Sequence, residues 1–191
     1  MKRVKIREVT GQDILAGKSD GLRDFPMLLG AVEEMAAGET VVLDWSNVEI
    51  ATASYLGATF VPLLRMAMQG QLDRYFVVAG LNKTCLEELK LVLELQNLVA
   101  LTGEWKDGSI QDPQVIGRLE PVYAATLNAV QNAEAASAAD LFKKDGGRAR
   151  IGKTGWINRL SNLHRLRLVR KQRVGREYLF QSLSKERLHG R

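Results

Sequence analysis

The charged residues of this chain are unevenly distributed along its length, and this constrains the fold more than any other feature. Residues 1–117 contain 11 Lys and Arg against 16 Asp and Glu, a formal charge of −5, whereas residues 118–191 contain 16 against 6, a charge of +10. The change follows the segment WKDGSIQDPQVIG, which is rich in turn-forming residues. We therefore predict an acidic domain over residues 1–112, a linker over residues 113–117 and a basic domain over residues 118–191.

Composition excludes several classes of protein. With 191 residues, 46% of them apolar, the chain has enough apolar side chains to build one or two globular cores. Cys85 is the single cysteine, which excludes an intrachain disulfide and a cysteine-rich metal site, and two histidines offer little for zinc. The start MKRVKIREVTG lacks an apolar secretory core, and no apolar run reaches about 18 residues. We expect a cytoplasmic protein with no membrane partner, metal or cofactor.

The acidic half alternates between two kinds of apolar pattern. Short apolar or alternating runs predict strands at residues 2–9, 41–45, 75–79 and 98–101. Helical spacing predicts helices at residues 21–37, 54–68 and 84–95, with Pro26 in the first turn of one helix and a break near Pro62 in the next. This order favours an α/β domain, a sheet covered by helices.

The segment VVLDWSNVEIATASYLGATFVPLL resembles the strand–loop–helix of STAS domains, and more closely the STAS-like family of unknown function. Its marks are a buried strand ending in Asp44, a valine at Val48 and a serine at Ser54 that opens the next helix. YFVVAGLNKTCLEELKLVLELQNL resembles the following strand and helix, so the likeness covers roughly residues 40–100. It implies a STAS-like α/β domain that senses a signal or binds a protein partner.

Ser54 has two interpretations. In anti-anti-sigma members of the STAS family, an Asp-Ser-Ser/Thr-Gly-Leu motif presents a phosphorylatable serine, and Ser54 and Leu56 match its serine and leucine. Thr52 and Tyr55 replace the aspartate and the glycine of that motif. Ser54 is also a residue type that caps helices, and we favour this structural role over regulation.

The basic half predicts three helices followed by a hairpin. The helices cover residues 118–131, 134–143 and 153–166. The segment LVRKQRVGREYLFQSL predicts two strands on either side of a turn at Val174-Gly175-Arg176. The third helix places Trp156, Ile157, Leu160 and Leu163 on one face. Its other face holds no acidic residue and carries side chains that hydrogen-bond base edges and phosphates. Three helices and a basic hairpin predict a winged helix-turn-helix domain.

The segment WINRLSNLHRLRLVRKQRVGREYLF resembles winged-helix regulators of the MarR/ArsR type. Those families continue the recognition helix with spaced leucines and a Gly-Arg wing, matched here by Leu160, Leu163, Leu168, Val169, Gly175 and Arg176. Arg167 replaces the usual glycine at the helix end. The resemblance implies that double-stranded DNA is contacted by Lys153, Thr154, Asn158, Arg159, Ser161, Asn162, Arg165, Arg173 and Arg176.

Two further patterns carry less weight. Residues 147–154 match GxxxxGK[ST], the pattern of a phosphate-binding loop. Such a loop follows a buried strand, but the preceding segment DLFKKDG indicates the end of a polar helix. His164 lies at the edge of the apolar face of the third helix, which favours a half-buried structural role. The sequence contains no nucleophile–base–orienter set, so we do not expect an enzyme.

The leading hypothesis is a DNA-binding transcriptional regulator that works as a homodimer, with a STAS-like sensory or protein-interaction domain. The alternative is a protein-interaction adaptor of a partner-switching pathway, in which the acidic domain does the main work. A third hypothesis is that the protein is an ATPase, and only the GxxxxGK[ST] pattern supports it.

Overall fold

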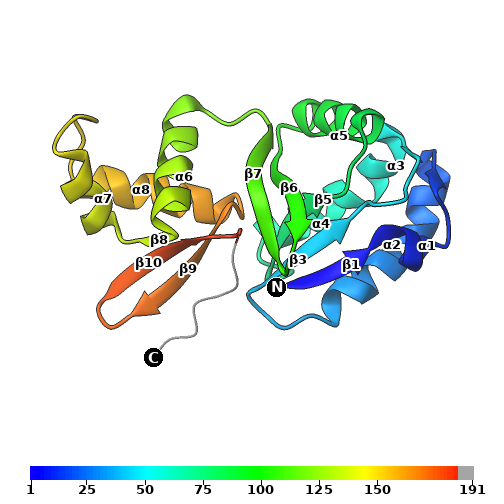
Figure 1. Ribbon diagram of the computed structural model, residues 1–191, viewed down its shortest axis with the longest axis horizontal. Coiled ribbons are helices and arrows are strands. Elements are labelled where there is room, and N and C mark those ends of the chain that lie inside the picture. Colours follow the sequence, from blue (N-terminus) through cyan, green and yellow to red (C-terminus); the bar gives the residue numbers. More distant parts are fainter. Residues whose placement is uncertain (185–191) are drawn as a thin grey trace. The chain divides into compact units, whose positions relative to one another are not determined.

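The computed structural model describes residues 1–184. The chain is mixed α/β with a largely parallel sheet, and its internal contacts separate two compact units, Met1–Arg118 and Leu119–Arg191 (Figure 1). We call them the first and the second unit and describe each by itself. Among the described residues, none of the helices combines the length and the apolar character needed to cross a bilayer.

The first unit contains a five-stranded sheet in the order β1-β3-β5-β6-β7. The first four strands are parallel, and β7 is antiparallel to β6. The bounds are β1 Lys2–Lys5, β3 Glu39–Asp44, β5 Arg74–Ala79, β6 Val99–Lys106 and β7 Ser109–Gly117. A second, two-stranded parallel sheet pairs β2 Ile14–Leu15 with β4 Ile50–Ala51.

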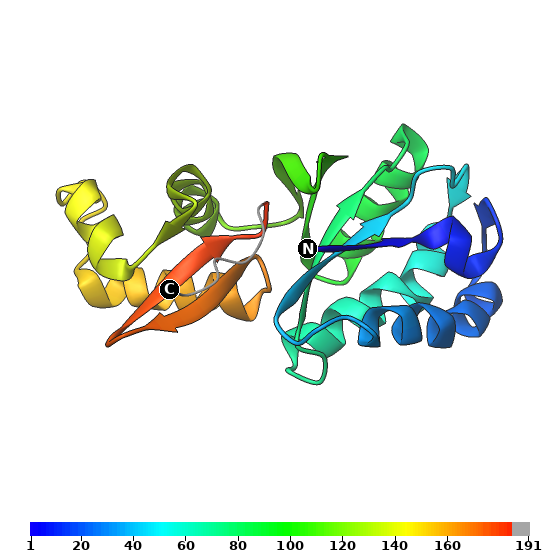
Figure 2. The same ribbon diagram turned by 60° about the horizontal axis from the view of Figure 1, so that its bottom comes forward.

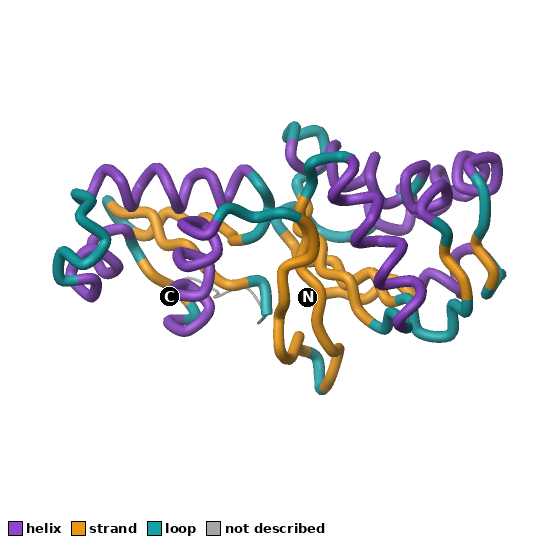
Figure 3. The backbone as a smooth tube through the Cα atoms, turned by 90° about the horizontal axis from the view of Figure 1, so that it is seen from above, coloured by secondary structure: helices purple, strands orange, loops and turns teal. Residues whose placement is uncertain are grey.

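Five helices belong to the first unit: α1 Ile6–Thr10, α2 Lys18–Glu33, α3 Ala53–Ala58, α4 Phe60–Met68 and α5 Lys83–Leu95. Successive parallel strands always add on the same side of the previous strand, so right-handed crossovers bring the helices to one face of the sheet. Figure 3 shows these helices gathered on one side of the strands. The core lies between the two layers, where Val41, Leu43 and Phe76 of the sheet meet Leu63 and Leu93 of the helices.

Several predicted elements of the first unit are corrected by the structure. The expected linker 113–117 is part of β7, which completes the sheet by pairing with β6 from Val99 to Lys106. The first strand ends at Lys5, because Ile6 turns inward as the start of α1. The expected helix 54–68 is two helices that meet at Thr59, just before Pro62.

The position of Pro26 is a further correction. The helix that contains it begins at Lys18, so the proline lies in the interior of α2 and not in its first turn. Tertiary contacts stabilise the additional N-terminal turns. Buried Asp24 accepts a hydrogen bond from the Tyr55 hydroxyl of α3 at 3.1 Å and one from Arg23 at 2.9 Å. Gly21 also leaves room for Ala58, because a Cβ at this position would collide with it.

The second unit has three helices and a three-stranded antiparallel sheet in the order β8-β10-β9. The bounds are α6 Pro121–Ala133, β8 Ala135–Ala136, α7 Ala138–Asp145, α8 Lys153–Arg165, β9 Val169–Val174 and β10 Glu177–Ser182. Its core is built from Leu127, Val130, Leu141, Trp156, Leu160, Leu163 and Phe180. Figure 2 shows the β9–β10 hairpin, in orange and red, as a two-stranded ribbon.

Local signals explain where these elements start and turn. Ser137 and Asp140 form a reciprocal capping box at the start of α7, which satisfies amide groups that the helix itself cannot pair. Gly146 ends α7 in the left-handed conformation, which glycine adopts without steric cost. Gly175 also has positive φ at the hairpin turn, where the twist of the strands requires it.

Candidate nucleic-acid interface

Helix α8 presents a polar, acid-free face. Trp156, Leu160 and Leu163 are buried in the core, as their spacing predicts. Thr154, Asn158 and Arg165 are exposed, and no acidic residue occurs between Lys153 and Arg165. A helix face of this kind offers donors and acceptors to base edges and a positive charge to phosphates.

Asn162 is held inside the second unit. Its Nδ2 donates to the Tyr123 hydroxyl of α6 at 2.5 Å, and its Oδ1 accepts from Nη2 of Arg165 at 2.8 Å. Both ends of the amide therefore have partners, one on a neighbouring helix and one on its own. Asn162 anchors α8 to α6 and orients the Arg165 guanidinium, which remains exposed.

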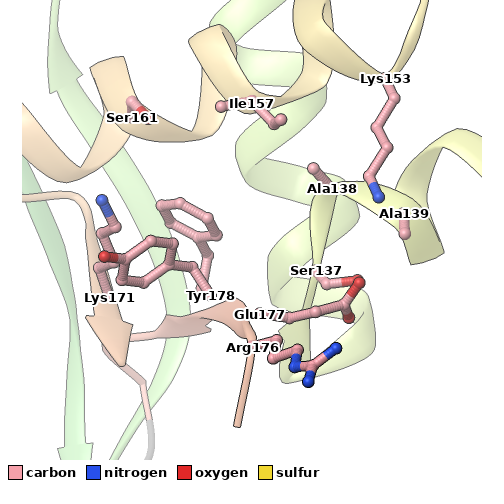
Figure 4. Close-up of a pocket in the computed structure, with 11 residues that line it drawn as sticks. Ser137, Ala138, Ala139, Lys153, Ile157, Ser161, Lys171, Arg176, Glu177 and Tyr178 are labelled. Atoms are coloured by element: carbon pink, nitrogen blue, oxygen red, sulfur yellow. The ribbon is translucent and has the colours of Figure 1, made fainter. Parts of the chain in front are cut away.

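A groove of about 260 Å³ separates α8 from the β9–β10 hairpin, and we call it the hairpin groove. Apolar side chains and cations both line it, as Figure 4 shows. Its residues are Ser137, Ala138, Ala139, Lys153, Ile157, Ser161, Lys171, Arg176, Glu177, Tyr178 and Phe180. Three elements thus contribute to it: the start of α7, one side of α8 and the hairpin.

The hairpin register alternates aromatic and basic side chains on one face. Tyr178 pairs with Arg173 and Phe180 pairs with Lys171, so all four project from the same side of the ribbon. The Lys171 ammonium lies 4.0 Å from the centre of the Tyr178 ring and 5.9 Å from that of Phe180. This cation–π contact orients the tyrosine ring, which nevertheless stays 48% exposed.

The cations of the hairpin groove are not paired with carboxylates within residues 1–184. None of the ion pairs within this part of the chain involves Lys153, Lys171 or Arg176. Glu177 is the one acidic residue among those that line the groove. Three cations against one carboxylate leave a positive potential that favours an anionic ligand.

The structure separates the predicted DNA contacts into groups. Lys153, Ser161 and Arg176 come together at the hairpin groove. Thr154, Asn158 and Arg165 lie on the exposed face of α8, outside the groove. The remaining predicted contacts have internal partners: Arg159 lies over the Trp156 ring at 5.5 Å, Arg173 donates to the Gly175 carbonyl at 3.3 Å, and Asn162 is bound as described.

Groove residues that the sequence prediction missed include Ile157, Lys171 and Tyr178. Ile157 was expected in the core with Trp156, yet it is 43% exposed and lines the groove, because no neighbouring element covers that edge of the apolar face. Lys171 and Tyr178 were not singled out. Their signal was present in the hairpin, where alternate residues on paired strands share a face.

The GxxxxGK[ST] segment connects two helices in the structure. Residues 147–152 lie between α7 and α8, and Asp145 accepts a hydrogen bond from the Ala149 amide at 2.9 Å. A phosphate-binding loop of this pattern follows a buried strand, and α7 stands in that place. His164 is half-buried, with Nδ1 3.3 Å from the Val169 carbonyl oxygen, which suits a structural residue that ties α8 to β9.

Ser54 does not cap α3. The N-cap is Thr52, whose hydroxyl accepts from the Tyr55 amide at 3.4 Å and from the Gly17 amide at 3.2 Å. The Ser54 hydroxyl is exposed and lies 3.1 Å from that of Thr52. The capping role expected for Ser54 is therefore wrong, because the N-cap of α3 lies two residues earlier than the pattern indicated.

The first unit also has a cavity, of about 680 Å³, at the carboxyl ends of its parallel strands. Buried Asp44 lies in it and accepts hydrogen bonds from Arg3 Nε at 2.6 Å and from the Ser46 amide at 2.9 Å. Burial alone would raise the pKa of Asp44, but the hydrogen bonds from Ser46 and Arg3 outweigh it and lower the pKa below its usual value. Within residues 1–184, no group of three or more His, Cys, Asp or Glu side chains is placed to hold a metal.

Comparison with known proteins adds no assignment to this geometry. No protein-family model matches the chain, and neither a curated protein nor a solved structure gives a significant match.

Proposed function

We propose that the protein is a DNA-binding transcriptional regulator, in which the second unit is a winged helix-turn-helix domain and α8 is its recognition helix. The observation that carries the proposal is the acid-free exposed face of α8 beside a basic hairpin. Three helices followed by a hairpin with cations near its tip form the arrangement of that motif, in which the helix enters the major groove and the hairpin lies along the backbone.

The charge of the second half supports duplex DNA as the partner. Lys and Arg exceed Asp and Glu by ten over residues 118–191, and the groove cations have no carboxylate partner among the described residues 1–184. Each phosphate that such a cation neutralises releases condensed counterions, so affinity falls as salt rises. Asn158 and Arg165 on α8 would read bases, whereas Lys153 and Arg176 would contact the backbone.

Titration of labelled duplex DNA with the full chain tests this proposal. We expect log Kd to rise linearly with log salt, with a slope of about 0.9 per phosphate contact. The double variant Asn158→Ala/Arg165→Ala should weaken binding to the best site by about tenfold or more, since a good base contact contributes roughly 1 to 3 kcal/mol. Affinity that does not change between low and moderate salt would overturn the proposal.

The first unit would be the sensory or interaction domain, on its resemblance to STAS-like sequences. Ser54 is exposed at the first turn of α3, in the place where the resemblance puts partner contacts. This exposure keeps the partner-switching adaptor as the second candidate. A chain that shows no DNA binding, but whose association with a protein partner is abolished by Ser54→Asp, would favour the adaptor.

We also propose that the regulator acts as a homodimer. One recognition helix contacts only a few base pairs, and a dimer places two such helices on two half-sites. Val122 on α6 is 42% exposed, which leaves apolar surface for pairing in the second unit. Sedimentation of the chain alone and on its best DNA site should show two copies per site, and a monomer in both conditions would contradict the homodimer.

A further inference from the structure

The hairpin groove has features that paired DNA does not use. Tyr178 and Ile157 line it with an aromatic ring and a branched aliphatic chain, 48% and 43% exposed. A duplex offers phosphates and base edges to a protein, while the flat faces of its bases are covered by stacking. An exposed aromatic ring beside an aliphatic side chain is instead suited to the flat face of an unpaired base.

We propose that the hairpin groove binds an unpaired nucleobase of DNA, stacked on Tyr178, with the flanking phosphates held by Lys153, Lys171 and Arg176. This inference rests on the proposed DNA binding and names the state of DNA that the second unit prefers. The protein would favour a site with a locally opened step over a fully paired one.

The size of the groove fits this occupant. Its volume of about 260 Å³ falls below the roughly 300–1,000 Å³ of pockets for drug-sized ligands and cofactors. One planar base is a small enough ligand for such a space, whereas a dinucleotide cofactor is not. Ser161 supplies a hydroxyl group along the wall, which can hydrogen-bond the edge of a base without requiring a particular one (Figure 4).

The charges of the groove fit the same occupant. Lys171 covers one side of the Tyr178 ring at 4.0 Å, so a base would stack on the opposite side of the ring. Lys153 comes from the first turn of α8 and Arg176 from the hairpin turn, so cations are supplied by two separate elements. A base that enters the groove carries a phosphate on each side, and this arrangement offers a cation to both. Binding sites for single-stranded nucleic acids commonly combine aromatic rings with cationic side chains.

The test compares three labelled DNA ligands with the full chain: a paired duplex, the same duplex with a three-nucleotide mismatched bubble, and one of the strands. Because stacking of one base on an aromatic ring is worth about fivefold to a hundredfold in affinity, we expect the bubble to bind at least fivefold more tightly than the duplex. A 2-aminopurine placed in the bubble should lose fluorescence on binding, as a stacked base does.

Variants of Tyr178 test whether its ring causes the preference for the bubble over the duplex. Tyr178→Ala and Tyr178→Leu should both abolish the preference and the quenching while changing the duplex Kd by less than twofold, and Tyr178→Phe should retain both. The leucine variant keeps the apolar contact, so it separates stacking from a loss of folding, which circular dichroism monitors. Phe142→Ala is the matched control, because Phe142 is a 40% exposed aromatic of the same unit that does not line the groove.

The outcomes separate this inference from the proposed function. Binding of duplex and bubble with equal affinity would overturn the inference and leave the regulator proposal standing. A bubble preference that survives in Tyr178→Ala would also overturn it. Failure to bind any of the three ligands would overturn the DNA-binding function, and the inference with it.

Discussion

The two units of this protein handle charge in opposite ways. In the first unit, several cations are paired with carboxylates: Arg3 with Asp44, Arg7 with Asp13, and Arg23 with both Asp20 and Asp24. In the second unit, the groove cations Lys153, Lys171 and Arg176 have no carboxylate partner among residues 1–184. The pair between Arg3 and buried Asp44 joins β1 to the end of β3 and so serves the fold. Unpaired cations that converge on one groove remain available for an anion.

The cavity of the first unit and the hairpin groove of the second unit show the same contrast in charge. The cavity of the first unit contains the Asp44 carboxylate, already neutralised by Arg3, together with Glu104 and Asp112. The hairpin groove of the second unit carries three cations and one carboxylate. An anionic polymer is therefore repelled by one hollow and attracted by the other. The net charge of +5 therefore conceals two surfaces of opposite charge.

The first way to sharpen this comparison is to destabilise one unit at a time. Leu93 in the first unit and Leu160 in the second are both fully buried. Leu93→Ala and Leu160→Ala should each cost about 2 to 5 kcal/mol, because each leaves a cavity in a closely packed core. Hydrogen exchange, resolved by peptide, should show faster exchange in the mutated unit alone. An equal loss of protection in both units would show that the chain unfolds as one body.

The second way to sharpen the comparison is to reverse charges in one unit and then in the other. Lys153→Glu/Arg176→Glu should weaken duplex binding by about a hundredfold and lower the salt slope by about 1.8, because two phosphate contacts are lost. Lys83→Glu/Lys90→Glu, at two exposed positions of α5, changes the net charge by the same amount. We expect this control to change the Kd by less than threefold. Equal losses in the two variants would mean that overall charge, and not the two cations Lys153 and Arg176, drives binding.

The third concerns pH and the Asp44 carboxylate. The pKa of Asp44 is lower in the folded chain than in the unfolded chain, so its ionised form stabilises the fold. This stabilisation is complete above the unfolded pKa of about 3.9 and is lost as pH falls through the folded value. Asp44→Asn should cost about 1 to 3 kcal/mol at pH 7. Urea unfolding should show the two proteins converging in acid, and a difference that stays constant with pH would refute this role.

The smallest expected effects are at helix caps, one in each unit. Thr52→Ala at α3 and Ser137→Ala at α7 should each cost about 1 kcal/mol, since each hydroxyl accepts a hydrogen bond from an otherwise unpaired amide. Ser54→Ala should stay within about 0.5 kcal/mol of the wild type, because Ser54 does not cap α3. Thermal unfolding of the three variants checks the order. A cost at Ser54 equal to that at Thr52 would contradict the assignment of the cap.

Much of the second unit could be predicted because its signals are local. The helix over residues 153–165 follows from the spacing of Trp156, Leu160 and Leu163, and the hairpin follows from alternation around Gly175. In the first unit, the buried strands 41–45 and 75–79 were equally clear as apolar runs. Strand β7 was not, because its residues include Pro113 and several polar side chains typical of a loop. It is a strand because β6 pairs with it, and such pairing leaves no trace in local composition.

The sequence by itself determined the division of charge, the order of the helices and strands in outline, and the acid-free face of α8. All of these depend on residues that are neighbours along the chain or one turn apart. Only the tertiary structure decided that Asn162 binds Tyr123, that Ile157 is left uncovered and that Tyr178 lies under Lys171. The physical reason is that periodicity assigns a side chain to a face of its own helix or strand. What covers that face depends on elements far away in the sequence, and the hairpin groove is assembled from three of them.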